Sequence, residues 1–570
     1  MLTLRDKAVR YLARHAEEIL SKQNEKGEFW PDAGFRAPYN TDYQQFGYYP
    51  FAYLYTLKHA DNPWFEHPRV LEAVVRSFKN NLAILGDDGK FMASSHDAPP
   101  HPGPNNWRSF SWLRALELMR PHLDPSLVNQ CEAGLQRAMT AVEAHIRRET
   151  ADPGFCRNHN VRNHPMWYLL ALLALGRAFG KDSSAAFATE QLERVCAAQH
   201  PDGLWFEHDG PVAVYQHISM SAISHYHALT GSAAARAALE KSLEYFRVFT
   251  YPTGVPVEAL DGRVRYTGYM MSIHPAQWSA SPHGRSYLHF ILDRLLAAPF
   301  GPGYQTHGSW LGLPFFTQFA RDLPESEPTD SLPPPLVGDG VYALKQIPIR
   351  LIRKGPWTLT LSGFTRPEAP RNRWELDFQT HLSVHHEKAG LIIGGGGGKR
   401  QAAFSLFSGG SRPLGLPCLA LSGTASTTGD ASARLTLHYP EFAATVDATV
   451  ETDSVAVTFS VTRNTGSTDT LPIFVQLPSP MKGPAPIVTE KGARPEMDLQ
   501  DELLAEDIGT WIGREGAYKI SGVDGARALL HVLPFNTHWR DGRSPAEKAM
   551  SIVAFPLSPG TPRHIRITAE

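Results

Sequence analysis

DLPESEPTDSLPPPLVGDG, residues 322–340, is rich in proline, serine and acidic residues, which is the composition of a linker. Before this stretch, apolar residues recur every three or four positions, the spacing of one helix face. After it they alternate, as in ARLTLHY and SVAVTFSVTR, which is typical of antiparallel strands. A chain of 570 residues is also too long for one hydrophobic core. We therefore predict a multidomain fold, with a helical domain over 1–320, a linker over 321–340 and a large antiparallel β-sandwich over 341–570.

A short loop that contains glycine recurs through the helical half. The loops are KGEFW at 26–30, DGKF at 88–91, DPGF at 152–155, DGLWF at 202–206 and TGV at 253–255. Apolar spacing predicts helices between them, over 4–22, 68–84, 125–147, 164–180, 183–199, 214–230 and 232–248. A repeated helical hairpin cannot bury its apolar face alone, so the hairpins must stack on one another. We predict an (α/α) toroid, a closed or nearly closed ring of helical hairpins with the glycine loops gathered at one end.

Composition and charge narrow the function classes. A formal net charge of −2 gives no overall field that would attract nucleic acid or a membrane surface. The first residues, MLTLRDKAVRYLARHAEEIL, have the pattern of an amphipathic helix, and no apolar run is long enough to span a membrane. The four cysteines are scattered, without metal-type spacing, which fits a reducing compartment. We expect a cytoplasmic protein without a membrane span or a cleaved export signal.

The stretch RNHNVRNHPMWY, residues 157–168, is the first candidate site. Pro165 is a favourable first residue of a helix, which places Asn163 and His164 at the helix start. A helix start carries free N–H groups and partial positive charge, so an amide and an imidazole there can hold a carboxylate. His159 belongs to the preceding loop, which presents the second Asn-His pair. The competing interpretation is that Asn163 only caps the helix and His164 packs beneath the loop.

A second candidate lies in QHPDGLWFEHDGPVAVYQHISM, residues 199–220. Tyr215 and His217 fall in the first turn of a predicted helix, and Trp205 lies in the loop before it. In a ring of antiparallel hairpins, helix starts that follow equivalent loops lie at the same rim. We therefore expect Tyr215 to lie near Asn163. The alternative is that Tyr215 is a core aromatic residue with its hydroxyl paired elsewhere.

Two aromatic-rich stretches, FRAPYNTDYQQFGYYPFAYLY at 35–55 and HPGPNNWRSFSW at 101–112, suit a carbohydrate ligand. Aromatic faces stack on sugar rings, and interleaved polar side chains bond their hydroxyls. Arg108 can also pair with a carboxylate through two parallel hydrogen bonds. These stretches supply the candidate substrate ligands Tyr43, Asn106, Trp107 and Arg108. The competing interpretation is packing between helical repeats.

NHPMWY at 163–168, followed by Tyr215 in YQHISM, resembles the alginate lyase and heparinase II/III-type polysaccharide lyases. Those families have a helical toroid followed by an antiparallel β-sandwich, an Asn-His pair at a helix start and a catalytic tyrosine on the next inner helix. The resemblance implies that Asn163, His164 and Tyr215 are catalytic. It also implies a residue of the sandwich that closes the cleft, for which His385 and His386 are candidates. Pro165 departs from the small glycine often found after the Asn-His pair.

The chemistry that the resemblance implies is β-elimination on a uronic-acid glycan, an oligo- or polysaccharide. Donors on the uronate carboxylate stabilise the enolate-like intermediate that forms when the C5 proton leaves. Asn163 and His164 would supply these donors, with Arg108 as a third. Tyr215 would protonate the leaving oxygen, and Tyr215 or His164 would remove the proton. This scheme needs no metal or organic cofactor, and the sequence is compatible with a homo-oligomer.

Two other functions remain open at this point. A glycoside hydrolase on the same toroid needs two carboxylates across the sugar bond. The candidates are Glu207, Asp209, Asp42 and Glu258. Turn formation is the alternative role of these acids. A non-catalytic carbohydrate-binding protein would explain the aromatic residues, but not the gathering of Asn, His and Tyr at helix starts.

Overall fold

The computed structural model separates into two compact units. A helical unit comprises Met1–Gly210, Val214–Arg247 and Tyr269–Pro335, and a strand unit comprises Pro211–Ala213, Val248–Gly268 and Leu336–Glu570. The residues that the structure describes are 2–29, 47–93, 101–262, 270–298, 312–369, 371–375, 377–394, 399–410, 416–417, 419–464, 472–481, 486–493, 508–536, 542, 544 and 548–570.

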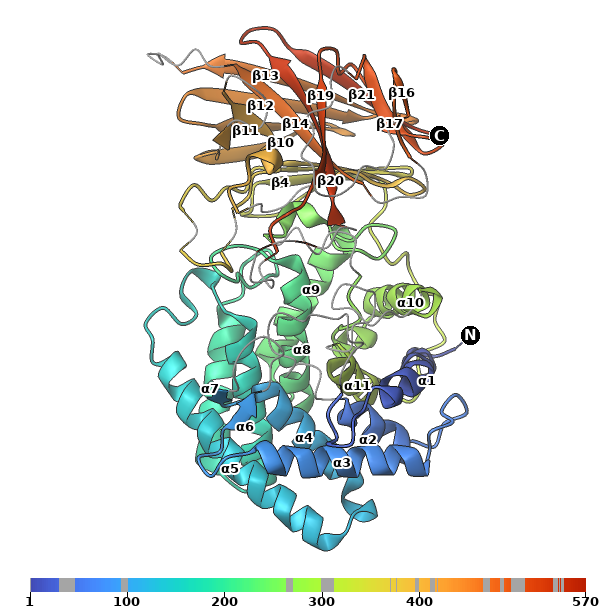
Figure 1. The fold of residues 1–570 in the computed structure, drawn as a ribbon, viewed down its shortest axis with the longest axis vertical. Coiled ribbons are helices and arrows are strands. Elements are labelled where there is room, and N and C mark those ends of the chain that lie inside the picture. The colour runs from blue at the N-terminus through green and yellow to red at the C-terminus, as the bar shows by residue number, and fades with distance from the viewer. Residues whose placement is uncertain are drawn as a thin grey trace. The chain divides into compact units, whose positions relative to one another are not determined.

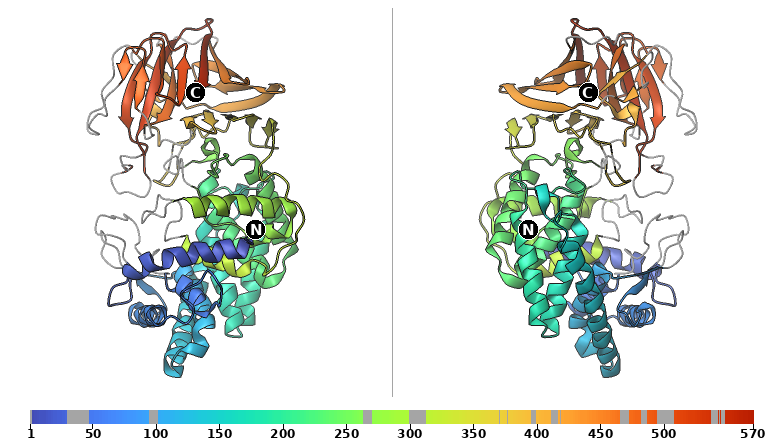
Figure 2. Two further views of the ribbon diagram at one scale, coloured as in Figure 1. Left: turned by 90° about the vertical axis from the view of Figure 1, so that its right-hand side faces the viewer. Right: turned by 90° about the vertical axis from the view of Figure 1, so that its left-hand side faces the viewer.

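The helical unit is built from helices that pair along the chain (Figure 1). They are α1 (Leu4–Ser21), α2 (Tyr48–Thr56), α3 (Pro68–Ile84), α4 (Asn106–Met119), α5 (Pro125–Thr150), α6 (Asn163–Ala178), α7 (Asp182–Ala197), α8 (Ala213–Thr230), α9 (Ala233–Val248), α10 (Pro282–Ala297) and α11 (Leu313–Asp322), with the short strands β1 (Phe91–Ala93) and β2 (His101–Gly103). Helices α2, α4 and α6 pack side by side. Helix α1 contacts both α10 and α11, and Figure 2 shows the dark-blue α1 beside the yellow-green α10. The first helix thus packs on the last two, which closes the ring.

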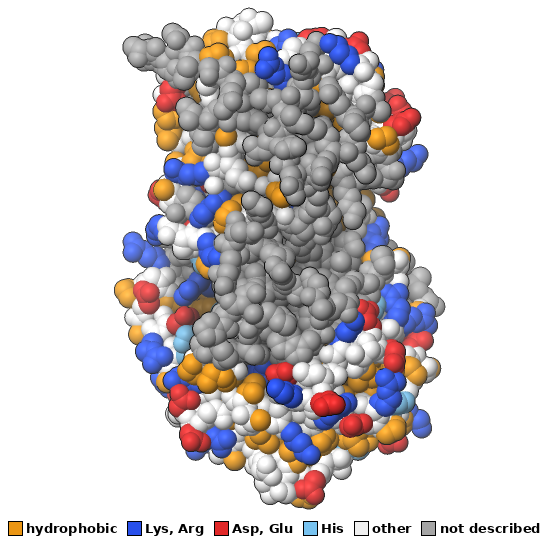
Figure 3. All heavy atoms as spheres, in the orientation of Figure 1, with side chains coloured by type: hydrophobic (Ala, Val, Ile, Leu, Met, Phe, Trp, Pro, Cys, Tyr) orange, Lys and Arg blue, Asp and Glu red, His pale blue; other side chains and the backbone are white. Residues whose placement is uncertain are grey.

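The inner helices are buried on nearly every side. In α6 the run from Met166 to Gly176 is buried throughout, as expected of a helix with no polar face. The outer helices α1, α3, α5, α7 and α9 instead bury one apolar stripe. None of the helices in the described ranges is both long and apolar enough to cross a bilayer. Positive and negative side chains are interspersed over the described part of the face in Figure 3.

The glycine loops join neighbouring hairpins by a repeated contact. Gly203 has a φ of +88°, and a Cβ added to it would lie 2.5 Å from the carbonyl oxygen of Lys241 on α9. Gln199 secures the same contact by donating its Nε2 to the carbonyls of Gly203 and Ala238 and to Ser242 Oγ, at 3.1, 2.9 and 3.0 Å. The loops at Gly27 and Gly89 pack on α3 and α5 in the same way. Glycine is therefore required there both by φ and by the lack of space.

The loop at 152–160 departs from this repeat. Gly154 donates its N–H to Asp152 Oδ1 at 2.7 Å. A short 3-10 helix, Arg157–His159, follows, and Cys156, Asn158 and His159 have φ values of +65°, +51° and +63°. This irregular segment leads directly into α6.

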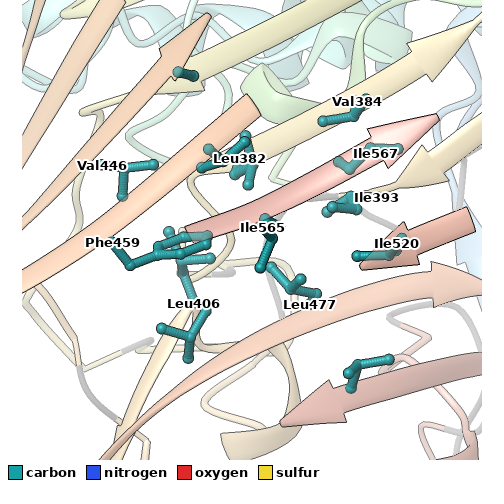
Figure 4. Close-up of a cluster of buried hydrophobic side chains, with 14 of the residues drawn as sticks. Leu382, Val384, Ile393, Leu406, Val446, Phe459, Leu477, Ile520, Ile565 and Ile567 are labelled. Carbon is teal, nitrogen blue, oxygen red and sulfur yellow. The ribbon is translucent and has the colours of Figure 1, made fainter. Parts of the chain in front are cut away.

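The described residues of the strand unit form three antiparallel sheets. One has the order β10 (Ser422–Gly429), β11 (Ser432–His438), β12 (Phe442–Val450), β13 (Ser454–Arg463), β21 (Arg563–Ala569), β18 (Tyr518–Ser521), β17 (Trp511–Arg514), β15 (Ile487–Thr489), β16 (Gly492–Ala493). A second has β19 (Arg527–Val532), β20 (Met550–Leu557), β14 (Ile473–Pro480), β8 (Phe407–Gly409), β9 (Leu416–Pro417). The third has β3 (Gly340–Ala343), β4 (Ile349–Lys354), β5 (Trp357–Ser362), β6 (Leu382–His386), β7 (Gly390–Ile393). Side chains from all three sheets share one apolar core (Figure 4).

Residues 248–262 pack within the strand unit although they directly follow a helix. Arg353 of β4 donates to the carbonyl of Val248 at 2.8 Å. Tyr251 stacks on His385 of β6, with ring centroids 4.2 Å apart, and Ser383 of β6 bonds Glu258. These contacts attach the segment to one sheet.

The proline-rich stretch after α11 is attached to the helical unit as far as Pro335. Arg285 of α10 donates to both carboxylate oxygens of Asp330 at 2.8 and 2.7 Å. His289 lies 2.9 Å from Glu327. A segment with linker composition is therefore held along α10 by buried side chains.

Candidate active site

Helix α6 begins at Asn163, and its N-cap residue, Arg162, makes no side-chain cap. Pro165 is thus the third helical residue rather than the first, which is tolerated because N–H groups of the first turn have no partner within the helix. Asn163 does not cap the helix with its side chain. It donates its Nδ2 to both carboxylate oxygens of Glu207, at 3.0 and 2.9 Å, and both residues are buried.

Glu207 lies at the base of a tight turn. Its N–H donates to the carbonyl of Gly210 at 2.9 Å, and the two residues between them, His208 and Asp209, have φ values of +56° and +64°. Two consecutive residues at positive φ are a conformation that glycine and asparagine adopt more readily than other residues. Positive φ at two residues with side chains costs on the order of 1 kcal/mol each, and such strain clusters at functional sites.

Backbone pairing fixes this turn against the start of α6. Phe206 donates to the carbonyl of His159 at 2.8 Å, and Val161 donates to the carbonyl of Phe206 at 2.8 Å. Asn160 then bonds Asp209 Oδ1 through its Nδ2 at 2.7 Å. The loop before α6 and the loop before α8 therefore meet.

His164 is supported by α4. Its ring stacks on Trp107 with centroids 4.7 Å apart, and its carbonyl accepts a bond from Asn106 Nδ2 at 3.0 Å. Trp107 is only 3% exposed. The structure thus places Asn106 and Trp107 behind His164, whereas the sequence suggested a surface on which a sugar stacks.

Tyr215 and His217 both lie in the first turns of α8, but they have different surroundings. Tyr215 is buried, and its neighbour Gln216 bonds the backbone of Trp205, whose N–H lies 2.8 Å from Gln216 Oε1. His217 Nδ1 lies 3.0 Å from the carbonyl of Ile273. Burial, and then the neighbouring His274, lower the pKa of His217 well below its usual value. His217 is therefore a neutral core residue.

Three other candidate residues bond neighbouring helices and loops of the helical unit. Arg108 is buried and donates to Asn81 Oδ1 at 2.6 Å, with its guanidinium over the ring of Phe91. Trp205 is buried and donates to the carbonyl of Val195 at 2.8 Å. His159 Nδ1 lies 3.0 Å from the carbonyl of Ala198. Each of these contacts joins the site's loops and helices to the surrounding scaffold.

Two further candidates, His385 and His386, belong to the strand unit. His385 is buried under Tyr251 in the strand unit, and burial, followed by Arg353, lowers its pKa to about 3. His386 packs on Trp357, with ring centroids 4.5 Å apart. Asp42 and Tyr43 fall outside the described residues.

A Ser-His-Asp series in the helical unit has the hydrogen-bond order of a hydrolase triad. Ser221 Oγ lies 3.1 Å from His225 Nε2, and His225 Nδ1 lies 2.8 Å from Asp322 Oδ2. However, Ser221 and His225 are buried, and the imidazole lies beside the rings of Phe110 and Trp167. This series joins α8 to α11 and is part of the core.

Two residues of the site, His208 and Asn160, were not among the candidates from the sequence. The side chain of His208 is 18% exposed, and its Nε2 lies 3.9 Å from Glu207 Oε1. The sequence feature that could have identified His208 is the tripeptide His-Asp-Gly after Glu207, because Asp and Gly favour a tight turn. Within the described ranges, no cluster of three or more His, Cys, Asp or Glu side chains is arranged to hold a metal ion.

Comparison by sequence found no counterpart, because neither the family models nor the curated proteins matched. Comparison by structure found similar proteins. A chondroitin AC lyase of Streptomyces coelicolor A3, solved with chondroitin sulphate, matches with a TM-score of 0.55 at 12% identity, covering 99% of this chain and 79% of that one. A Paenibacillus xanthan lyase matches with a TM-score of 0.52 at 10% identity, covering 100% of this chain and 58% of that one. The fold predicted from the resemblance is confirmed: the chain has the helical toroid and antiparallel β-sandwich of polysaccharide lyases.

Proposed function

We propose that the protein is a lyase that cleaves a uronate-containing glycan by β-elimination. The observation that carries this proposal is the meeting of two loops at the start of α6. It brings Asn163 and His164 together with the turn that holds Glu207 and His208. The lyase fold supports the same chemistry.

The proposed reaction breaks the C5–H and C4–O bonds of the uronate and forms a C4–C5 double bond. Asn163 and His164 hold the uronate carboxylate, because donors on it stabilise the negative charge that develops as the C5 proton leaves. Tyr215 returns a proton to the leaving C4 oxygen. His164, Tyr215 and His208 are the candidates for the base, and His208 has the advantage that its side chain is 18% exposed.

A hydrolase is the second candidate, and its carboxylates are already engaged. Glu207 is 5% exposed and accepts the amide of Asn163, while Asp209 accepts the amide of Asn160. A hydrolase needs one protonated and one ionised carboxyl group, placed on opposite sides of the sugar bond. Glu207 and Asp209 are two residues apart on one turn, which does not favour that arrangement.

The test is a panel of uronate glycans that contains alginate, glucuronan, chondroitin and an ulvan-type polymer. Reducing ends report any cleavage, and ultraviolet absorbance of the C4–C5 double bond reports elimination alone. We expect both signals to rise together on one class of glycan. Reducing ends without the absorbance would instead support hydrolysis.

A further inference from the structure

Glu207 carries a buried carboxylate that the proposed elimination chemistry does not use. It is 5% exposed, and its partner Asn163 is 1% exposed. The carboxylate accepts Asn163 Nδ2 through both oxygens, at 3.0 and 2.9 Å. A buried charge is costly unless it is hydrogen-bonded, so this carboxylate needs such donors.

This pair decides which way the amide of Asn163 faces. An ionised carboxylate has only acceptors, so the NH₂ group of Asn163 must face Glu207 and the carbonyl oxygen must face away. In the described part of the structure Asn163 Oδ1 is buried and has no hydrogen-bond partner. Without Glu207 the two ends of the amide would compete for the same place.

The pair also leaves Asn163 a donor. The two N–H bonds of an amide diverge widely, whereas the two oxygens of one carboxylate lie close together. The nearly equal distances of 3.0 and 2.9 Å let a single N–H serve both oxygens of Glu207, which leaves the second N–H for another acceptor. Asn163 thus presents one N–H and one carbonyl oxygen in a fixed orientation.

We propose that Glu207 is a positioning residue, which orients the amide of Asn163 so that its second N–H meets the carboxylate of the substrate. This inference rests on the proposed lyase function and assigns Glu207 a role other than that of a hydrolase acid. The turn that carries Glu207 is paired with the loop before α6, so both partners are held at the backbone as well.

The Glu207→Gln variant tests the pair with little change in shape. A glutamine presents either its oxygen or its nitrogen to Asn163, so the amide no longer has one preferred orientation. Donation to the carboxylate matters most when charge develops, so kcat falls while KM changes little. Misplacement of a catalytic group costs up to about 100-fold in rate, and we expect kcat to fall about 10- to 100-fold.

A double-mutant cycle with Asn163→Ala separates positioning from a direct role. If Glu207 acts only through Asn163, Glu207→Gln has no further effect on kcat in the Asn163→Ala background. Additive losses, or an unchanged kcat in Glu207→Gln alone, would overturn the proposal. Glu193→Gln is the matched control, because Glu193 also accepts two hydrogen bonds, from Tyr226 and Ser232, away from the site.

A second measurement reports the pair without turnover. Asparagine is labelled with ¹⁵N in the full-length protein, and the side-chain amide signal of Asn163 is identified by its loss in Asn163→Ala. We expect this signal to shift in Glu207→Gln and to stay unchanged in Glu193→Gln; an unchanged signal in both would refute the pair. If the glycan panel shows hydrolysis or no cleavage, the lyase function fails while this signal still decides whether Glu207 orients Asn163.

Discussion

At the scale of single residues, the candidates divide by their partners. Asn163 bonds Glu207, and His164 stacks on Trp107 of α4. Arg108 and Trp205 have the residue types of a sugar site but donate into the scaffold. A sequence shows which side chains can bind a glycan, whereas the fold decides which partners each of them has.

Removing the hydroxyl of Tyr215 tests its role as the acid. We expect Tyr215→Phe to lower kcat by about 10²- to 10⁴-fold, because general acid–base catalysis contributes that much. Affinity for the oligosaccharide, measured by calorimetry, should change little. Tyr226→Phe on the same helix is the control and should keep its turnover. Full activity of Tyr215→Phe would remove Tyr215 from the mechanism.

Arg108→Met tests the placement of Arg108 against Asn81. It leaves buried polar groups without their partner, which costs about 1–3 kcal/mol of unfolding free energy. We expect a lower midpoint in urea unfolding and an unchanged KM. A raised KM at unchanged stability would favour the substrate-binding role that the sequence suggested.

At the scale of elements, the outer helices follow their predicted ranges closely. Apolar spacing predicted 68–84 and 183–199, and the structure has Pro68–Ile84 and Asp182–Ala197. The helices without a prediction are α2, α4, α10 and α11. Helix α2 is buried on nearly all sides, and α4 buries polar residues such as Asn106 and Ser109, so neither shows a polar and an apolar face. Helices that are buried in this way form the inner ring of the toroid.

The contact of Gly203 with α9 predicts that alanine substitutions at two glycines differ in their cost to stability. Gly203 and Gly231 have φ values of +88° and +71°, but only Gly203 lacks space for a Cβ. Gly231→Ala should cost about 1 kcal/mol for its backbone conformation alone. Gly203→Ala should cost clearly more, because Cβ would overlap a helix carbonyl. Equal midpoints in thermal unfolding would show that the contact does not hold the hairpins together.

At the scale of the whole molecule, the change of apolar period predicted two kinds of structure, and both are present. The period did not predict that residues 248–262 join the strand unit. Their contacts, such as Tyr251 on His385, are made far along the chain. Local spacing identifies an element but not its tertiary partner, which also explains why His208 became a candidate only when its turn met α6.

Buried histidines make the whole fold sensitive to acid. Burial lowers the pKa of His15 to about 3, and that of His274 and of His381 to about 4. In the unfolded chain a histidine titrates near its usual pKa of about 6.5, so the unfolded state binds more protons below that pH. The contribution of these neutral histidines to the free energy of unfolding is therefore fully present above about pH 6.5. It falls toward pH 4 by up to about 1.4 kcal/mol per pH unit for each histidine.

The pH dependence can be checked by urea unfolding at several pH values. We expect His381→Gln to lose less stability on acidification than the parent protein, because one neutral histidine is removed. Equal slopes would mean that His381 is protonated in the folded protein as well.

The central claim, elimination on a uronate glycan, is tested most directly by cleaving the responsive glycan in water labelled with heavy oxygen. Elimination adds no water, so the fragments should carry no label at the cleaved bond, and their masses should sum to that of the substrate. Hydrolysis places one oxygen from water on the new reducing end. Label incorporated during the reaction, as opposed to slow exchange measured on isolated product, would contradict the lyase account.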